Sequence, residues 1–100
     1  MSLASVSLVE GHLQLNGVLD YRTGTQLREQ GKALVNQLQG TDVIVDCAGV
    51  ERASSVGISL LLALSRDARD AGKVLKVRAL PRELSQIADV CGVSPLLSIV

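Results

Sequence analysis

The fold is organised around the stretch ERASSVGISLLLALSRDAR, residues 51–69. Ser54 is suited to cap a helix here, because a serine hydroxyl accepts a hydrogen bond from an otherwise unpaired amide of the first turn. Ser55 then falls in that exposed first turn, where the positive end of the helix dipole suits a phosphate or a polar partner group. Apolar residues on more than one face predict that the rest of the helix is covered on most sides. These residues are Ile58, Leu60, Leu61, Leu62 and Leu64.

The end of this helix is also marked in the sequence. Four charged residues follow the leucines, and we expect them to face water: Arg66, Asp67, Arg69 and Asp70. Gly72 follows them, and glycine readily adopts the left-handed conformation in which helices commonly end.

Two strands are expected at the start of the chain. Apolar and polar residues alternate over residues 3–8, which predicts a half-buried strand, and a turn follows at Glu10 and Gly11. The alternation resumes from His12 to Leu19, so the two strands are predicted to form a hairpin. Gly17 indicates a bulge or bend, and the inward set of the second strand is Leu13, Leu15 and Val18.

A helix is predicted next, with Asp20 as its N-cap and a span from Tyr21 to about Gln39. Gly40 is expected to close it. Its inward face has helical spacing and comprises Leu27, Gly31, Leu34, Val35 and Leu38.

A central parallel strand is predicted from Asp42 to Cys47, because a short apolar run rich in β-branched residues lies between two helices. Residues 48–53 are predicted to be a loop that leads to the serines. A further strand is expected from Val74 to Leu80, and residues 96–100 form either a last short strand or an apolar tail.

The third helix is predicted to start at Pro81 and to end at Gly92. Its buried stripe is predicted to be Leu84, Ile87, Ala88 and Cys91. The whole pattern predicts an α/β fold, a mixed sheet of four or five strands with its helices mainly on one face. We expect a partner site where the central strand delivers Asp46 to the loop before Ser54.

The composition favours some classes of partner and argues against others. One hundred residues, 47% of them hydrophobic, predict a single domain over residues 1–100. Ten basic and ten acidic side chains give no net charge, which argues against nucleic acid and anionic membranes and favours a protein partner. The sequence has two isolated cysteines, Cys47 and Cys91, and shows neither a second cysteine pair nor a signal peptide. We therefore expect two reduced, partly buried thiols in a cytoplasmic protein, and no zinc site. The apolar run at 58–64 is too short to span a membrane.

No catalytic, cofactor or metal site is predicted. The chain has one histidine, His12, which is expected to be an exposed residue at a strand end, with no partner at triad or ligand spacing. No glycine-rich phosphate loop follows a strand. A simpler alternative for Ser54 and Ser55 is that both residues only begin a helix, as serine pairs often do.

The run DCAGVERASSVGISLLLAL resembles the signature of the STAS domain family, in which a strand ends in Asp and a short loop leads to Asp-Ser/Thr-x-Gly at the start of a leucine-rich helix. In that resemblance Asp46 matches the strand-end Asp, Ser55 the phosphorylatable residue and Gly57 the Gly. Ser54 stands where the family usually has a second Asp. The segment LNGVLDYRTGTQLRE is similar to the family's turn into its first helix.

Within that family, the compact length and the LLLAL helix are most similar to the small STAS subunit of the Mla phospholipid ABC transporter. That resemblance implies a cytoplasmic protein, peripheral to the inner membrane, that binds and stabilises the ATPase subunit. The alternative branch is the anti-sigma-factor antagonist, whose partner is an anti-sigma kinase that phosphorylates the serine. The expected partner surface around Ser55 comprises Asp46, Arg52, Ser54, Val56 and Gly57.

Overall fold

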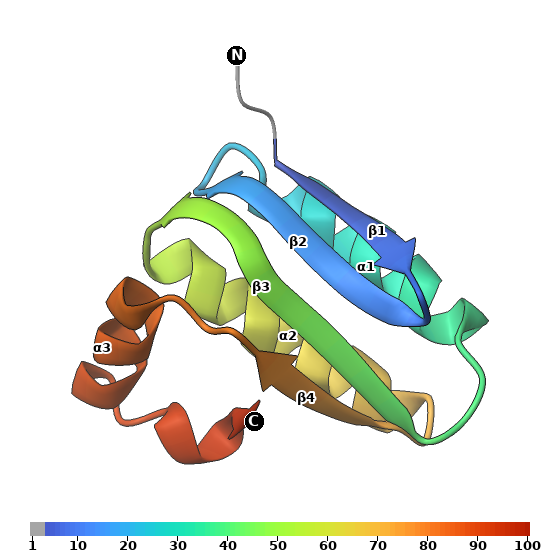
Figure 1. Ribbon diagram of the computed structural model, residues 1–100. Helices are drawn as coiled ribbons and strands as arrows, with labels where there is room; N and C mark the ends of the chain where they lie inside the picture. The colour runs from blue at the N-terminus through green and yellow to red at the C-terminus, as the bar shows by residue number, and fades with distance from the viewer. Residues whose placement is uncertain (1–3) are drawn as a thin grey trace.

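Five strands form one mixed sheet in the computed structural model, which describes residues 4–100 (Figure 1). The predicted α/β fold class and the predicted order of elements are confirmed. Leu3, at the start of the first predicted strand, lies outside the described residues. The elements are β1 (Ser5–Val9), β2 (His12–Leu19), α1 (Gly24–Gln37), β3 (Asp42–Ala53), α2 (Ser55–Asp70), β4 (Val74–Arg78), α3 (Arg82–Val90), the short 3-10 helix η1 (Ser94–Leu96) and β5 (Ser98–Ile99).

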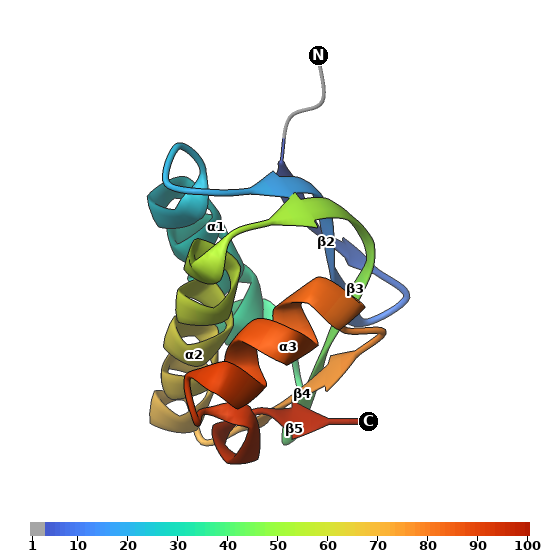
Figure 2. The ribbon, with the colours of Figure 1, turned by 90° about the vertical axis from the view of Figure 1, so that its left-hand side faces the viewer.

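The strands lie in the sheet in the order in which they occur in the sequence, from β1 to β5. β1 and β2 are antiparallel and form the predicted hairpin, whose turn holds Glu10 and Gly11 at φ 51° and 80°. The remaining pairs are parallel and are joined through helices. Figure 2 shows α1 and α2 as a layer on one side of the sheet, with α3 beside α2.

The core between this layer and the sheet is aliphatic. Leu13, Leu15 and Leu19 of β2 are almost fully buried, so the prediction of Val18 as an inward residue is wrong. The alternation of β2 continues without a break, which turns Leu19 inward and leaves Val18 half-buried. The irregularity expected at Gly17 is confirmed, since Gly17 has φ 89° and the register with β3 shifts between it and Val18.

Helix α1 begins at Gly24, three residues later than predicted. Asp20 is not its N-cap, because the Asp20 side chain accepts the N–H of Arg22 and stabilises a separate turn. The predicted inward face is confirmed at Leu27, Gly31 and Val35. A Cβ on Gly31 would lie 2.8 Å from the Leu64 Cδ2, so this glycine lets α1 pack closely on α2.

Strand β3 is twice as long as predicted and includes residues 48–53, which the sequence analysis assigned to a loop. These residues pair with the second half of β2, from Asn16 opposite Gly49 to Leu19 opposite Ala53. The extension matters for the site, because it moves Asp46 from the end of the strand to its middle.

Helix α2 begins and ends close to where it was predicted, but Asp67 does not face water. Its side chain is only 5% exposed and lies 3.5 Å from the guanidinium of Arg28 on α1. The predicted buried stripe of α3 is confirmed at Leu84 and Ala88, whereas Cys91 is exposed because it follows the last turn of a helix that packs on one side only. Of the two alternatives for residues 96–100, the short strand is the one found, at Ser98–Ile99.

Candidate partner-binding site

The start of α2 is held firmly to the sheet by Ser54. Its backbone N–H donates to the carbonyl of Leu19 at 3.0 Å, and its extended backbone turns the chain into the helix. The Ser54 hydroxyl accepts the N–H of Val56 at 3.2 Å, so the predicted cap is confirmed. Ser54 is therefore hydrogen-bonded both to the last residue of β2 and to the first turn of α2.

Ser55 is the first residue of α2 and is exposed. Its carbonyl accepts the Ser59 hydroxyl at 3.4 Å, but its own hydroxyl has no hydrogen-bond partner among residues 4–100. A free hydroxyl at the positive end of a 16-residue helix is accessible to a partner group or to a modifying enzyme.

A charged turn lies next to Ser54. Asp20 accepts the backbone N–H of Arg22 at 2.9 Å and forms an ion pair of 2.6 Å with its guanidinium. This hydrogen bonding lowers the pKa of Asp20 and raises the pKa of Arg22. Together with Arg52, Ser54 and Glu83, the pair lines an open hollow beside the start of α2. Arg22 and Glu83 were not predicted in the site. The signal that could have located Arg22 is Asp20, because an Asp favours a turn in which its side chain accepts the N–H two residues on.

Two residues predicted for the partner surface, Val56 and Gly57, also have packing roles. Gly57 is buried, and a Cβ there would lie 3.0 Å from the Leu84 Cδ2 and 3.3 Å from the Ala53 Cβ. Gly57 therefore allows Leu84 and Ala53 to pack closely beneath the first turn of α2. Val56 is half-buried, and its Cγ1 lies 2.8 Å from the position that a Cβ on Gly24 would take, which brings the starts of α1 and α2 together.

Asp46 lies apart from the serines, contrary to expectation. It sits seven residues before the end of β3, which corresponds to roughly 20 Å of strand. Its carboxylate pairs with Arg78 at 2.8 Å and accepts the N–H of Ala48 at 2.9 Å, and these hydrogen bonds lower its pKa. His12, half-buried at the start of β2, adds a smaller electrostatic contribution. Asp46 is thus part of an ion pair on the sheet and does not adjoin Ser54.

Comparisons with known proteins identify the family of the chain. A family model described as "Mlab, STAS domain" matches residues 3–98. A search of curated protein sequences finds no match. In the part of the chain that the structure describes, no helix is long and apolar enough to cross a bilayer.

Three solved structures illustrate the likeness. One chain of the Acinetobacter MlaFEDB complex, in an ATP-bound conformation, is 20% identical with a TM-score of 0.84, covering 96% of this chain and 99% of that one. The anti-sigma factor antagonist SpoIIAA, in its unphosphorylated form, is 17% identical with a TM-score of 0.72. The match covers 98% of this chain and 88% of SpoIIAA. An anti-sigma factor antagonist from Mycobacterium paratuberculosis is 19% identical with a TM-score of 0.75. The match covers 99% of this chain and 85% of that protein's chain.

Proposed function

The chain belongs to the STAS domain family, and from that membership we propose that it is a non-catalytic, single-domain STAS subunit of a phospholipid ABC transporter. In this role it binds the ATPase subunit, stabilises it and so supports the ATP-driven transport that maintains outer-membrane lipid asymmetry. Its expected place is the cytoplasmic side of the inner membrane, where the partner holds it. The observation that carries the proposal is the match of the Mlab family model to residues 3–98.

The start of α2 is the surface that we assign to the ATPase. It is rigid, because Ser54 is bonded both to β2 and to the helix, and Gly57 lets Leu84 pack directly beneath the first turn. It is also exposed at Ser55 and Arg52. A preformed surface of this kind loses little conformational entropy on binding, and a protein that binds only the folded ATPase stabilises it by mass action.

A catalytic role for Ser55 has no support in this geometry. A serine nucleophile needs a general base within hydrogen-bond reach. Asp20 and Glu83 line the neighbouring hollow, but among residues 4–100 neither carboxylate accepts a hydrogen bond from the Ser55 hydroxyl. We therefore propose that the surface acts by binding alone.

Co-purification tests the proposal. The chain is co-expressed with the ATPase subunit of the phospholipid transporter encoded in the same genome, and complexes are isolated through a tag on the ATPase. We expect the wild-type chain to be recovered and Ser55→Arg to be lost, because a bulky cation occupies the centre of the contact. Gln86→Arg places the same cation on an exposed turn of α3 and serves as the control. Equal recovery of Ser55→Arg and wild type contradicts the assignment of this surface.

The second candidate function is that of an anti-sigma-factor antagonist controlled by phosphorylation of Ser55. The free hydroxyl at the start of α2 favours it, and the comparison structures of SpoIIAA include a phosphorylated form of that protein. Incubation with the anti-sigma kinase of the same organism and ATP distinguishes the two functions. Incorporation of one phosphate that Ser55→Ala abolishes supports the antagonist, and its absence leaves the transporter subunit.

A further inference from the structure

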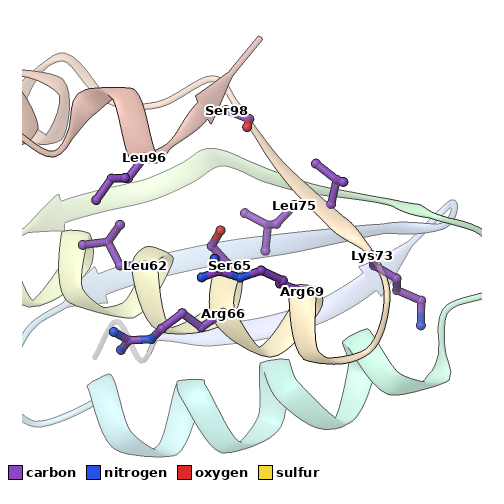
Figure 3. A pocket seen from close by; sticks show the side chains of 9 residues that line it. Leu62, Ser65, Arg66, Arg69, Lys73, Leu75, Leu96 and Ser98 are labelled. Atoms are coloured by element: carbon purple, nitrogen blue, oxygen red, sulfur yellow. The ribbon is translucent and has the colours of Figure 1, made fainter.

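A second surface lies at the edge of the sheet formed by β1 and has no part in the function proposed above. β1 is the outermost strand, and within residues 4–100 it pairs with β2 alone (Figure 1). The opposite edge is formed by β5, which has only two residues; Figure 3 shows this edge, with Ser98 beside β4. β1 is therefore the longer open edge of the described sheet.

The turn that joins β1 to β2 determines which backbone groups of β1 face outward. Both turn residues have positive φ, as in a two-residue turn in which the carbonyl of the first residue accepts the N–H of the fourth. Val9 is therefore bonded to His12, and every second residue of the antiparallel pair is bonded in the same way. The N–H and C=O groups of Val6 and Leu8 point away from the sheet, and they bond to no other backbone group among residues 4–100.

Nothing in the sequence of β1 protects this edge from pairing. Proteins commonly protect exposed edges with charged side chains, prolines or bulges. Residues 4–9 contain no charged residue and no proline, and their register with β2 is unbroken. Leu8 and Val9 are 38% and 43% exposed. The edge is therefore open to a further strand, and its side chains favour a strand without charges.

The side of α1 next to this edge is also uncharged. α1 packs over β1 and β2, whereas α2 packs over β3 and β4. α1 turns Gly24, Arg28 and Gly31 toward α2. With about 3.6 residues per turn, the opposite side of the helix consists of four exposed residues, Gln26, Gln30, Ala33 and Gln37. Strand edge and helix side thus form one neutral surface, in a chain of which 20% of the residues are charged.

We propose that this surface, the outer edge of β1 with the adjoining side of α1, binds a second copy of the chain. The two β1 strands pair antiparallel about a two-fold axis at Ser7, so that Val6 of each copy exchanges both backbone hydrogen bonds with Leu8 of the other. This register uses both outward-facing residues of each strand. The two α1 helices then lie on either side of the axis, on the same face of the continuous sheet.

The distribution of charge favours a second copy over a different protein. Pairing about a two-fold axis brings side chains close to their own copies, and like charges opposite each other are destabilising. β1 avoids this cost because none of its side chains is charged. The chain has no net charge, so two copies do not repel each other at long range. Val6, which already packs against the core, meets Leu8 of the second copy and extends the apolar contact across the axis.

Sedimentation equilibrium over a range of concentrations tests the proposal. We expect the mass of the wild-type chain to rise from that of a monomer to that of a dimer. Leu8→Lys should weaken the dimer at least tenfold, because a lysine on an edge strand opposes pairing. Val90→Lys, the same kind of change at an 88% exposed residue of α3, is the control and should leave the dimer unchanged. Gln30→Lys, on the exposed side of α1, should also weaken the dimer and keeps the test valid if Leu8→Lys misfolds.

Disulfide cross-linking tests the register. In an antiparallel pair that is not hydrogen-bonded, the two Cα atoms lie about 4.5 Å apart, a distance that a disulfide can bridge. The variants are made in a Cys91→Ser background, because Cys91 is exposed. Ser7→Cys should cross-link on mild oxidation. Ser5→Cys should not, since Ser5 of one copy lies opposite Val9 of the other.

Three outcomes overturn the proposal. These are a monomeric mass at every concentration, an equal loss of dimer in Leu8→Lys and Val90→Lys, and cross-linking of Ser5→Cys as efficient as that of Ser7→Cys. Hydrogen exchange at the Val6 and Leu8 amides is measured for the chain alone and in complex with the ATPase subunit. Protection in that complex alone would assign the edge to the ATPase instead.

Discussion

A negative charge at Ser55 should affect binding far more than folding. Ser55 is the first residue of α2, and an anion in that position is stabilised by about 0.3 to 1 kcal/mol through the helix dipole. For a chain of this length, a change of 1 kcal/mol corresponds to a Tm shift of roughly 4 to 8 °C. We therefore expect Ser55→Asp to melt at the wild-type temperature or a few degrees above it.

The same charge costs more at an interface. A carboxylate that loses its water without gaining a cation carries a penalty on the order of several kcal/mol, which exceeds the gain from the dipole. We expect Ser55→Asp to weaken the partner at least tenfold, which is about 1.4 kcal/mol. Ser55→Ala removes only the free hydroxyl and should weaken the partner less.

Thermal melts and calorimetric titration against the ATPase subunit measure the two effects separately. Ser59→Asp is the matched control, because it places the same charge one turn further along the exposed side of α2, where the dipole effect has declined. It should show no gain in Tm and a smaller loss of affinity. If wild type and Ser55→Asp bind equally, Ser55 is only a helix-start residue. A large fall in the Tm of Ser55→Asp would mean that the helix does not begin there.

Three further results are expected. Ser54→Ala should cost about 1 kcal/mol of stability, measured by urea unfolding, because the Val56 N–H loses its acceptor; an unchanged midpoint would show that the cap contributes nothing. Because the pKa of Asp46 is lowered in the folded chain, its contribution to stability is complete above the pKa of an unfolded Asp, about 4, and is lost as the pH falls through the lowered value. Arg78→Gln should therefore lose less Tm between pH 6 and pH 3 than wild type does, and an equal loss would contradict this. A thiol reagent at neutral pH should modify Cys91 and leave Cys47, whose burial raises its pKa to about 12, unmodified until the protein unfolds.

Local signals in the sequence were sufficient for most of the fold. Alternation identified β2 with the correct bounds, and the serine pair identified the start of α2, because strand period and helix capping depend on residues close together in the chain. The second half of β3 could not be recognised in this way. Gly49 and Arg52 are typical of a loop, and they become part of a strand only because β2 supplies Asn16 and Val18 as their partners. At Gly49 the absence of a Cβ is required by the Asn16 side chain, a contact between distant parts of the sequence.

The candidate site was predicted in part for the same reason. Ser54 and Ser55 lie where the capping pattern indicated. The prediction that Asp46 lies close to them assumed that the central strand ends at Cys47, and it is wrong because β3 continues to Ala53. The burial of Asp67 was also not predicted from the sequence. Its place in a run of charged residues predicted that it faces water, and its contact with Arg28 on the neighbouring helix joins distant parts of the sequence. Whether the site residues contact a partner stays a prediction.

The sequential order of the strands in the sheet bears on how the chain folds during synthesis. Each strand after β1 pairs with the strand that precedes it, so none has to insert between two strands that have already formed. The β1–β2 hairpin uses only residues near the start of the sequence, so it can form before the later strands have been synthesised, and each strand that follows extends an existing edge. Among the five strands, β5 is synthesised last. Growth in one direction should keep exposed edges short-lived and limit aggregation of the nascent chain.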